Sequence, residues 1–155
     1  MSFFSHLGKT VDNFSKPITH PEKMAGRLCS IFDSWEGIAK RNDLNIKYLL
    51  NHIAMIDFCY GYLHSGYSDY VNNCGGKINE TNYYAEVCNN LWSEYRFFNK
   101  IFSRFMNNKS KYDKYLGVTS LTGQLYQNVW SGKDIKEIFF VLLNDYVSKK
   151  PNLTI

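Results

Sequence analysis

The chain has 155 residues, of which 45% are hydrophobic and 17% aromatic, enough for one hydrophobic core and too little for two. Charged residues make up 21%, so the chain lacks the low hydrophobicity and high charge that are typical of disordered proteins. The formal net charge is +4, and its excess lies in residues 96–114, which carry six basic side chains and one acidic side chain. We therefore expect a single folded domain over residues 1–155.

The first predicted element is a short amphipathic helix over residues 1–16. Its apolar side chains recur at helical spacing ahead of Pro17: Phe3, Phe4, Leu7, Val11 and Phe14. The sequence leaves open whether this helix packs on the domain or docks on a membrane surface.

Residues 19–149 are predicted to form a helical bundle. Its first helix begins at a capping box formed by Thr19 and Glu22. The apolar residues of this helix fall on one stripe: Met24, Leu28, Ile31, Phe32, Trp35, Ile38 and Ala39. Gly26 and Gly37 lower the helix propensity, and such glycines can mark places where another helix approaches closely.

Asp43 is predicted to cap the next helix, which runs to about Ser65. The second half of this helix is apolar on nearly every side, which is typical of a central helix surrounded by others. The segment Gly66–Asn79 is predicted to be the longest loop, because Asn and Gly residues interrupt the pattern. A stripe from Tyr84 to Phe105 then predicts the longest helix, followed by a break at residues 107–112.

A further helix over residues 118–129 is predicted by the spacing of four apolar residues: Val118, Leu121, Leu125 and Val129. A second capping box, Asp134 with Glu137, opens a last helix that ends before Pro151. No segment alternates with a period of two, so strands are not expected.

The predicted fold is therefore all-α, a single compact bundle of about five to six helices around a hydrophobic central helix. Three residues at the centres of their stripes are predicted to be core residues: Trp35, Leu91 and Phe139.

The four cysteines, at positions 29, 59, 74 and 88, match neither zinc-ligand spacing nor the redox C-x-x-C motif. Free thiols indicate a reducing compartment, and the N-terminal residues lack the apolar stretch of a signal peptide. The longest nearly apolar run, Ile53–Leu63, is well short of the roughly 20 residues of a membrane span. We expect a cytoplasmic protein without metal, cofactor or transmembrane segment.

Asp57 is the most unusual titratable residue, because it lies in an apolar helix where an unpaired carboxylate is costly. His64 follows seven residues later, roughly 10.5 Å along a helix axis, which is too far for direct proton transfer. A relay through Tyr60 is sterically conceivable. The sequence thus leaves two hypotheses: Asp57 is a structural carboxylate bonded to a tyrosine or the backbone, or the protein is an enzyme that uses Asp57 and His64.

A tyrosine-rich segment over residues 60–76 is the first candidate contact surface. Tyrosine interleaved with Ser and Gly is typical of protein-binding surfaces. The candidate partner-binding residues are Tyr62, His64, Tyr67 and Tyr70, with Tyr67 and Tyr70 expected to be the more exposed. No catalytic motif is present, so the favoured function is a non-enzymatic protein–protein interaction module, an accessory or assembly subunit. Its partner is another protein or a second copy of the chain.

A basic patch over residues 96–114 is the second candidate surface. It comprises Arg96, Lys100, Arg104, Lys109, Lys111 and Lys114. The first three residues share one helical face, and neighbouring aromatic residues are able to stack on bases. The patch favours nucleic-acid binding as the alternative function, while an acidic protein partner and a plain solvated face stay open.

Lysine outnumbers arginine by 14 to 4, and Asn, Tyr, Phe and Ile are abundant. This bias is typical of AT-rich genomes, such as those of many phages, intracellular bacteria and some protists. A phage or viral accessory protein is consistent with this composition.

Overall fold

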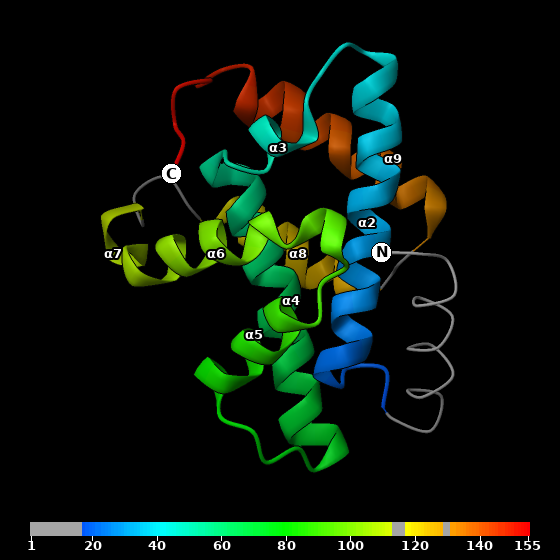
Figure 1. Ribbon diagram of the computed structural model, residues 1–155, viewed down its shortest axis with the longest axis vertical. Helices are drawn as coiled ribbons and strands as arrows, with labels where there is room; N and C mark the ends of the chain where they lie inside the picture. The colour runs from blue at the N-terminus through cyan, green and yellow to red at the C-terminus, as the bar shows by residue number, and fades with distance from the viewer. Residues whose placement is uncertain (1–16, 113–116, 129–130) are drawn as a thin grey trace.

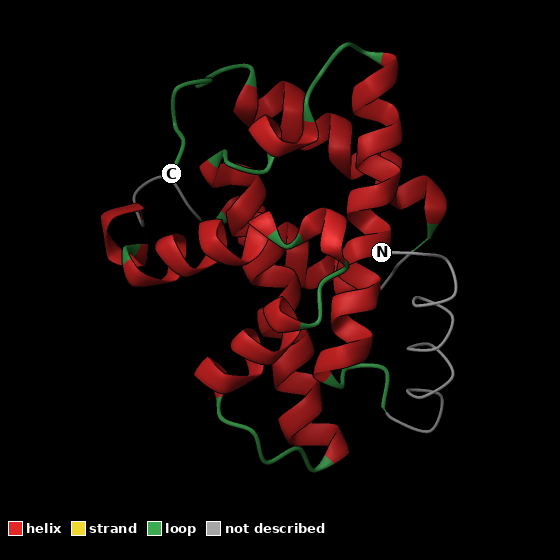
Figure 2. Ribbon diagram, viewed as in Figure 1, coloured by secondary structure: helices red, strands yellow, loops and turns green. Residues whose placement is uncertain are grey.

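The computed structural model of the protein describes residues 17–112, 117–128 and 131–155. Within these ranges the chain is all-α: helices alternate with loops, and Figure 2 shows no strand there. One isolated β-type pairing in this part of the chain joins His52 and Thr154. The predicted helix over residues 1–16 lies outside the described residues.

The first described helix, α2 (Pro21–Arg41), buries the predicted apolar stripe. Its N-cap is His20, whose ring accepts a hydrogen bond from the N–H of Glu22 at 3.4 Å. Thr19 instead donates its hydroxyl to Asp69 at 2.8 Å. The predicted capping box at Thr19 is therefore wrong, because a tertiary contact engages that side chain.

Two helices replace the single helix expected from Asp43 onward. Asp43 adopts a left-handed φ of 56° in the turn after α2 and is no N-cap. The first helix, α3 (Ile46–Leu49), is capped by Asn45, and the second, α4 (Ile53–Cys74), is capped by His52. Both caps accept a backbone hydrogen bond two residues ahead, which satisfies a donor that the helix itself leaves unpaired.

The helix α4 continues well beyond its expected end at Ser65. The predicted loop Gly66–Asn79 is therefore wrong over its first nine residues, up to Cys74. The helix ends at Gly75, whose φ of 67° is the left-handed conformation that terminates helices. Tyr70 and Gly66 are buried, so tertiary packing outweighs the weak helix propensity of this segment.

The long helix expected from Tyr84 to Phe105 is broken near Asn90. The chain here forms three helices and a 3-10 turn: α5 (Glu80–Asn89), η1 (Ser93–Tyr95), α6 (Phe97–Asn107) and α7 (Lys109–Tyr112). Asn90 ends α5, and its side-chain amide donates to the carbonyl of Glu86 at 2.8 Å. The predicted break at residues 107–112 is partly helical, because α7 lies within it.

The last elements are α8 (Val118–Asn128), α9 (Gly132–Leu142) and a π-helical turn (Leu143–Val147). The helix α9 starts before the predicted Asp134. Its N-cap is Ser131, whose hydroxyl oxygen accepts the N–H of Asp134 at 3.3 Å. The C-terminal residues return to α4, where the N–H of Ile53 donates to the carbonyl of Leu153 at 2.9 Å.

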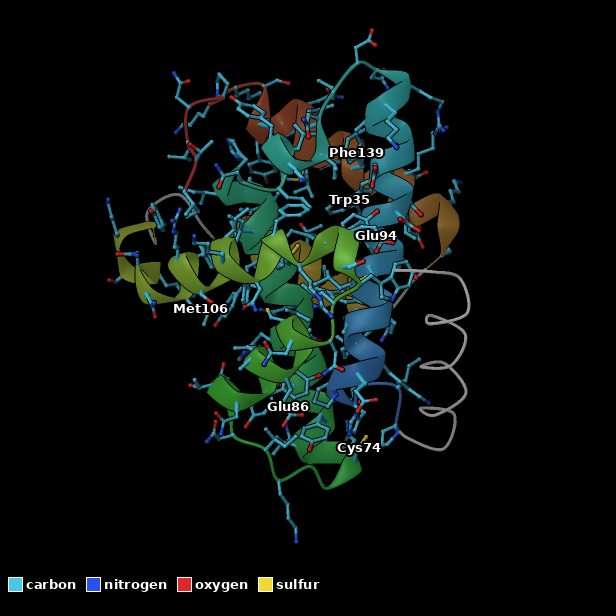
Figure 3. The ribbon with its side chains drawn as sticks, in the orientation of Figure 1. Trp35, Cys74, Glu86, Glu94, Met106 and Phe139 are labelled. Carbon is cyan, nitrogen blue, oxygen red and sulfur yellow. The ribbon has the colours of Figure 1, made fainter. Side chains whose placement is uncertain are left out.

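The described residues thus form eight α-helices rather than five to six, because two predicted helices are each divided and α7 is additional. The apolar helix α4 is central, as expected: it packs against α2, α5, α6 and α8 (Figure 1). Trp35, Leu91 and Phe139 are all fully buried, which confirms the predicted core positions. Figure 3 shows Trp35 near Phe139, and their ring centroids are 5.9 Å apart.

Candidate interaction surface

The helix α8 packs against α4 more extensively than any other pair of described elements. Two glycines permit this approach. A Cβ atom on Gly61 would lie 1.9 Å from the carbonyl oxygen of Ser120, and one on Gly123 would lie 2.1 Å from the carbonyl oxygen of Phe58. The backbones of the two helices are therefore in direct contact, which no residue with a side chain allows at these positions.

Asp57 caps the start of α8 from its position in α4. The carboxylate is 1% exposed and accepts hydrogen bonds from the Thr119 hydroxyl and from the N–H of Gly117, the latter at 3.4 Å. Burial raises the pKa of Asp57. The two hydrogen bonds oppose that shift, as do a further hydrogen bond from the N–H of Ser120 and the positive charge of Lys109. A carboxylate that satisfies the N–H groups at a helix N-terminus stabilises the helix, so Asp57 anchors α8 on α4.

We expect Asp57→Ala to lower the free energy of unfolding by about 2–4 kcal/mol, because the Thr119 hydroxyl and the N–H groups at the start of α8 lose their buried acceptor. Asp57→Asn keeps an acceptor oxygen and should lose less stability.

The stability of the wild type should also depend on pH, because the pKa of Asp57 is higher in the folded state than in the unfolded state. As the pH rises from the unfolded-state pKa, about 3.9, through the folded-state pKa, the wild type should lose stability relative to Asp57→Asn. Urea unfolding across this pH range measures both effects, and parallel pH curves for the two proteins would contradict the assignment.

The apolar stripe of α8 faces solvent. Val118, Leu121 and Leu125 are 63%, 57% and 68% exposed. The face of α8 that is buried carries small and polar residues instead: Thr119, Ser120, Gly123, Tyr126 and Gln127. An amphipathic helix normally turns its apolar stripe to the core. Here the close contact with α4 requires small residues on the buried face, which leaves the larger apolar side chains outside. Val129, the fourth predicted stripe residue, lies outside the described ranges.

A groove of about 220 Å³ lies beside this stripe, between α8 and α9. Leu125 and Ile138 contribute its apolar lining, and the carboxylates of Asp134 and Glu137 also line it. Lys133 lies 3.8 Å from Glu137, so the start of α9 carries both signs of charge. We use the name α8–α9 surface for the three exposed apolar side chains of α8 together with the half-buried Ile138 of α9: Val118, Leu121, Leu125 and Ile138.

The tyrosines predicted to contact a partner pack against neighbouring aromatic rings. Tyr62 is fully buried and Tyr70 is 8% exposed. The expected exposure of Tyr70 is wrong, because α4 continues to Cys74 and turns this ring toward α5. The half-buried ring of Tyr67 lies 5.0 Å from the ring of Tyr83, and the ring of Tyr70 lies 5.2 Å from it. Tyr62 and Tyr70 therefore stabilise the interior and offer a partner little area.

The hydroxyl of Tyr62 has no hydrogen-bond partner among the described residues. Burial raises the pKa of Tyr62 to about 12, although the positive charge of Arg27 opposes the shift. The Arg27 guanidinium lies 5.5 Å from the centroid of the Tyr62 ring and donates to the carbonyl of Gln127 at 3.1 Å. Arg27 therefore ties α2 to the end of α8, which adds a second attachment of this helix to the core.

His64 lies at the contact of α4 with α5, away from the partners of Asp57. Its Nδ1 atom is 3.2 Å from a carboxylate oxygen of Glu80 and 3.2 Å from the hydroxyl of Tyr84. The Tyr84 hydroxyl donates to Glu80 at 2.9 Å, and the ring of Tyr60 stacks on His64 at 5.7 Å. The two residues of the enzyme hypothesis thus have separate hydrogen-bond partners, and no hydrogen bond in the described part of the chain joins them.

The basic patch is divided between two environments. Arg96, Lys100 and Arg104 are exposed along α6, and none of them forms an ion pair with a described carboxylate. Lys109 instead places its ammonium 4.8 Å from the ring centroid of Tyr60. Lys111 lies 5.8 Å from the ring of its neighbour Tyr112, and Lys114 lies outside the described residues. The face of α6 therefore presents the three basic residues of the patch that are open to a partner.

The described residues hold no group of three or more His, Cys, Asp or Glu side chains placed to bind a metal ion. All four cysteines are free thiols, and Cys74 alone among them is exposed. None of the helices that the structure describes has both the length and the apolar character of a membrane span.

No protein-family model matches the chain, and no curated protein or solved structure is significantly similar to it.

The α8–α9 surface is the feature that sequence reasoning missed. The spacing of Val118, Leu121 and Leu125 predicts a helical stripe, but nothing in that spacing shows which face of the helix meets α4. A signal was present in the small residues Ser120 and Gly123 on the other face, together with Gly61 in the central helix. Small residues three or four positions apart permit close helix contact, and that requirement competes with the burial of the apolar stripe.

Proposed function

We propose that the protein is a non-enzymatic helical interaction module, an accessory or assembly subunit that binds a protein partner through its α8–α9 surface. The observation that carries this proposal is the solvent exposure of Val118, Leu121 and Leu125 on one face of α8. An exposed cluster of large apolar side chains rimmed by polar residues is typical of a protein contact site. The tyrosines that first suggested partner binding are largely buried, which moves the proposed contact to this surface.

The attachment of α8 supports the same proposal. The carboxylate of Asp57 and the glycine contacts at Gly61 and Gly123 hold the helix on the core. A surface that is already rigid loses little conformational entropy when a partner binds. The exposed stripe is therefore presented in one fixed orientation, as a binding helix requires.

The experiment that tests this function measures the size of the protein by light scattering, alone and after mixing with an extract of the source cells. We expect a larger species, and we expect the double variant Leu121→Glu, Leu125→Glu to lose it. The matched control is Tyr48→Glu, since Tyr48 on α3 is 58% exposed and receives the same charge. A double variant that assembles as well as the control would refute the proposed surface.

Nucleic-acid binding is the second candidate, because Arg96, Lys100 and Arg104 project from α6 without a described acidic partner. Three phosphate contacts to a single strand should give a slope of about −2 in a plot of log affinity against log salt concentration. The triple substitution of these residues by Gln should remove that dependence. Fluorescence anisotropy with labelled single-stranded DNA and RNA measures it, and an absence of binding at low salt would exclude this candidate.

A further inference from the structure

We infer that the α8–α9 surface binds a second copy of the same chain, in a dimer with two-fold symmetry. This inference rests on the proposed function and names the partner. A two-fold contact places the same patch of both subunits face to face, so the patch must complement itself in shape and in charge. The α8–α9 surface is the described apolar face that meets this requirement.

The charge distribution is the main argument for a second copy. Residues 118–128 of α8 contain no charged side chain, so two copies of this helix meet without repulsion between like charges. The start of α9 carries two cations and two anions, Lys133 and Lys136 with Asp134 and Glu137, so the rim offers both signs to its symmetry mate. The protein as a whole has a formal charge of +4, which opposes self-association on an exclusively cationic face such as that of α6.

The spacing of the stripe is the second argument. Val118, Leu121 and Leu125 stand at positions i, i+3 and i+7, the pattern by which one helix packs along another. A second α8 presents the same stripe and therefore supplies the matching apolar partner. Contacts between identical subunits are also more apolar than transient contacts between different proteins, in agreement with a seam formed by three aliphatic residues.

The test is sedimentation equilibrium of the purified full chain, without extract, from low micromolar to submillimolar concentration. We expect the wild type to reach twice the monomer mass of 18.1 kDa. Leu121→Glu, Leu125→Glu should weaken the association by about thirtyfold or more, the effect of losing a central contact residue. Tyr48→Glu should dimerise like the wild type. Far-UV circular dichroism checks the fold of each variant. If the double variant is unfolded, the uncharged Leu125→Gln variant takes its place in the test of dimerisation.

Two results would overturn the inference. The first is a wild-type protein that stays monomeric at every concentration, which excludes a second copy of the chain as the partner. The proposed function would then still be tested by the extract experiment. The second is a dimer that the α8 substitutions leave intact, which places the contact between copies elsewhere. Dimerisation that the α8 substitutions abolish and the Tyr48 substitution preserves would support the inference.

Discussion

Trp35→Ala is expected to lower the free energy of unfolding by about 3–5 kcal/mol, because it removes the largest side chain of the core. The indole is fully buried, and its ring centroid lies 5.5 Å from that of Phe58 and 5.9 Å from that of Phe139. Its Nε1 atom also donates to the carbonyl of Ile135 at 3.0 Å, which links α2 to α9. The truncation leaves a cavity between three helices that surrounding side chains refill only in part.

Chemical denaturation measures this loss, with two variants for comparison. Trp35→Phe keeps an aromatic ring in the site and should lose less stability than Trp35→Ala. Tyr48→Ala removes an exposed ring on α3 and should change the free energy of unfolding by no more than about 0.5 kcal/mol. An equal effect at Trp35 and Tyr48 would show that the stripe of α2 is not the core of the fold.

Gly61→Ala and Gly123→Ala are each expected to lower the free energy of unfolding by about 3 kcal/mol or more, above the usual range for overpacking. The added Cβ atoms would lie 1.9 Å and 2.1 Å from backbone oxygens of the facing helix. Backbone atoms cannot rotate away as a flexible side chain does, so α8 must move off α4. The two substitutions act on one contact, so their combined effect should be smaller than the sum of the separate effects.

Gly26→Ala is the matched control for these substitutions. It lies within α2, and a Cβ atom there has no neighbour within 4 Å. Alanine should therefore stabilise the protein by about 0.5–1 kcal/mol through its higher helix propensity. Thermal unfolding ranks the three variants, and a similar loss at Gly26 and Gly61 would contradict the close contact of α4 with α8.

The helical class and the core were accessible from the sequence, because hydrophobic periodicity depends on residues that are close in the chain. Trp35 and Phe139 could be placed for this reason. Features that depend on tertiary contact could not be predicted from the sequence. The end of α4 is an example: Asn and Gly residues predicted a loop, while packing of Tyr70 against Tyr83 keeps the segment helical. Gly26, expected as a possible site of close helix approach, has open space beside it, while the close contacts are at Gly61 and Gly123.

The candidate site was less accessible from the sequence than the fold. Tyrosine content pointed to residues 60–76, but tyrosine serves equally in a core, and the facing helix α5 supplies the rings that cover Tyr67 and Tyr70. The direction of the α8 stripe depends on contacts with α4, both the close approach at Gly61 and Gly123 and the hydrogen bond to Asp57, which lies sixty residues from Gly117 in the chain. A pairing at that separation leaves no local pattern, and the small residues Gly61, Ser120 and Gly123 are the one sequence signal for the face that is buried.

The most direct test of the α8–α9 surface is photo-cross-linking from position 125. A photoreactive amino acid at Leu125, which is 68% exposed, should capture a protein chain in an irradiated sample, while the same group at Tyr48 should not. Mass spectrometry then identifies the captured chain, and a peptide of α8 or α9 from a second copy is the result that the structure predicts. Equal capture at the two positions, or none at Leu125, would contradict the assignment of this surface as the partner-binding site.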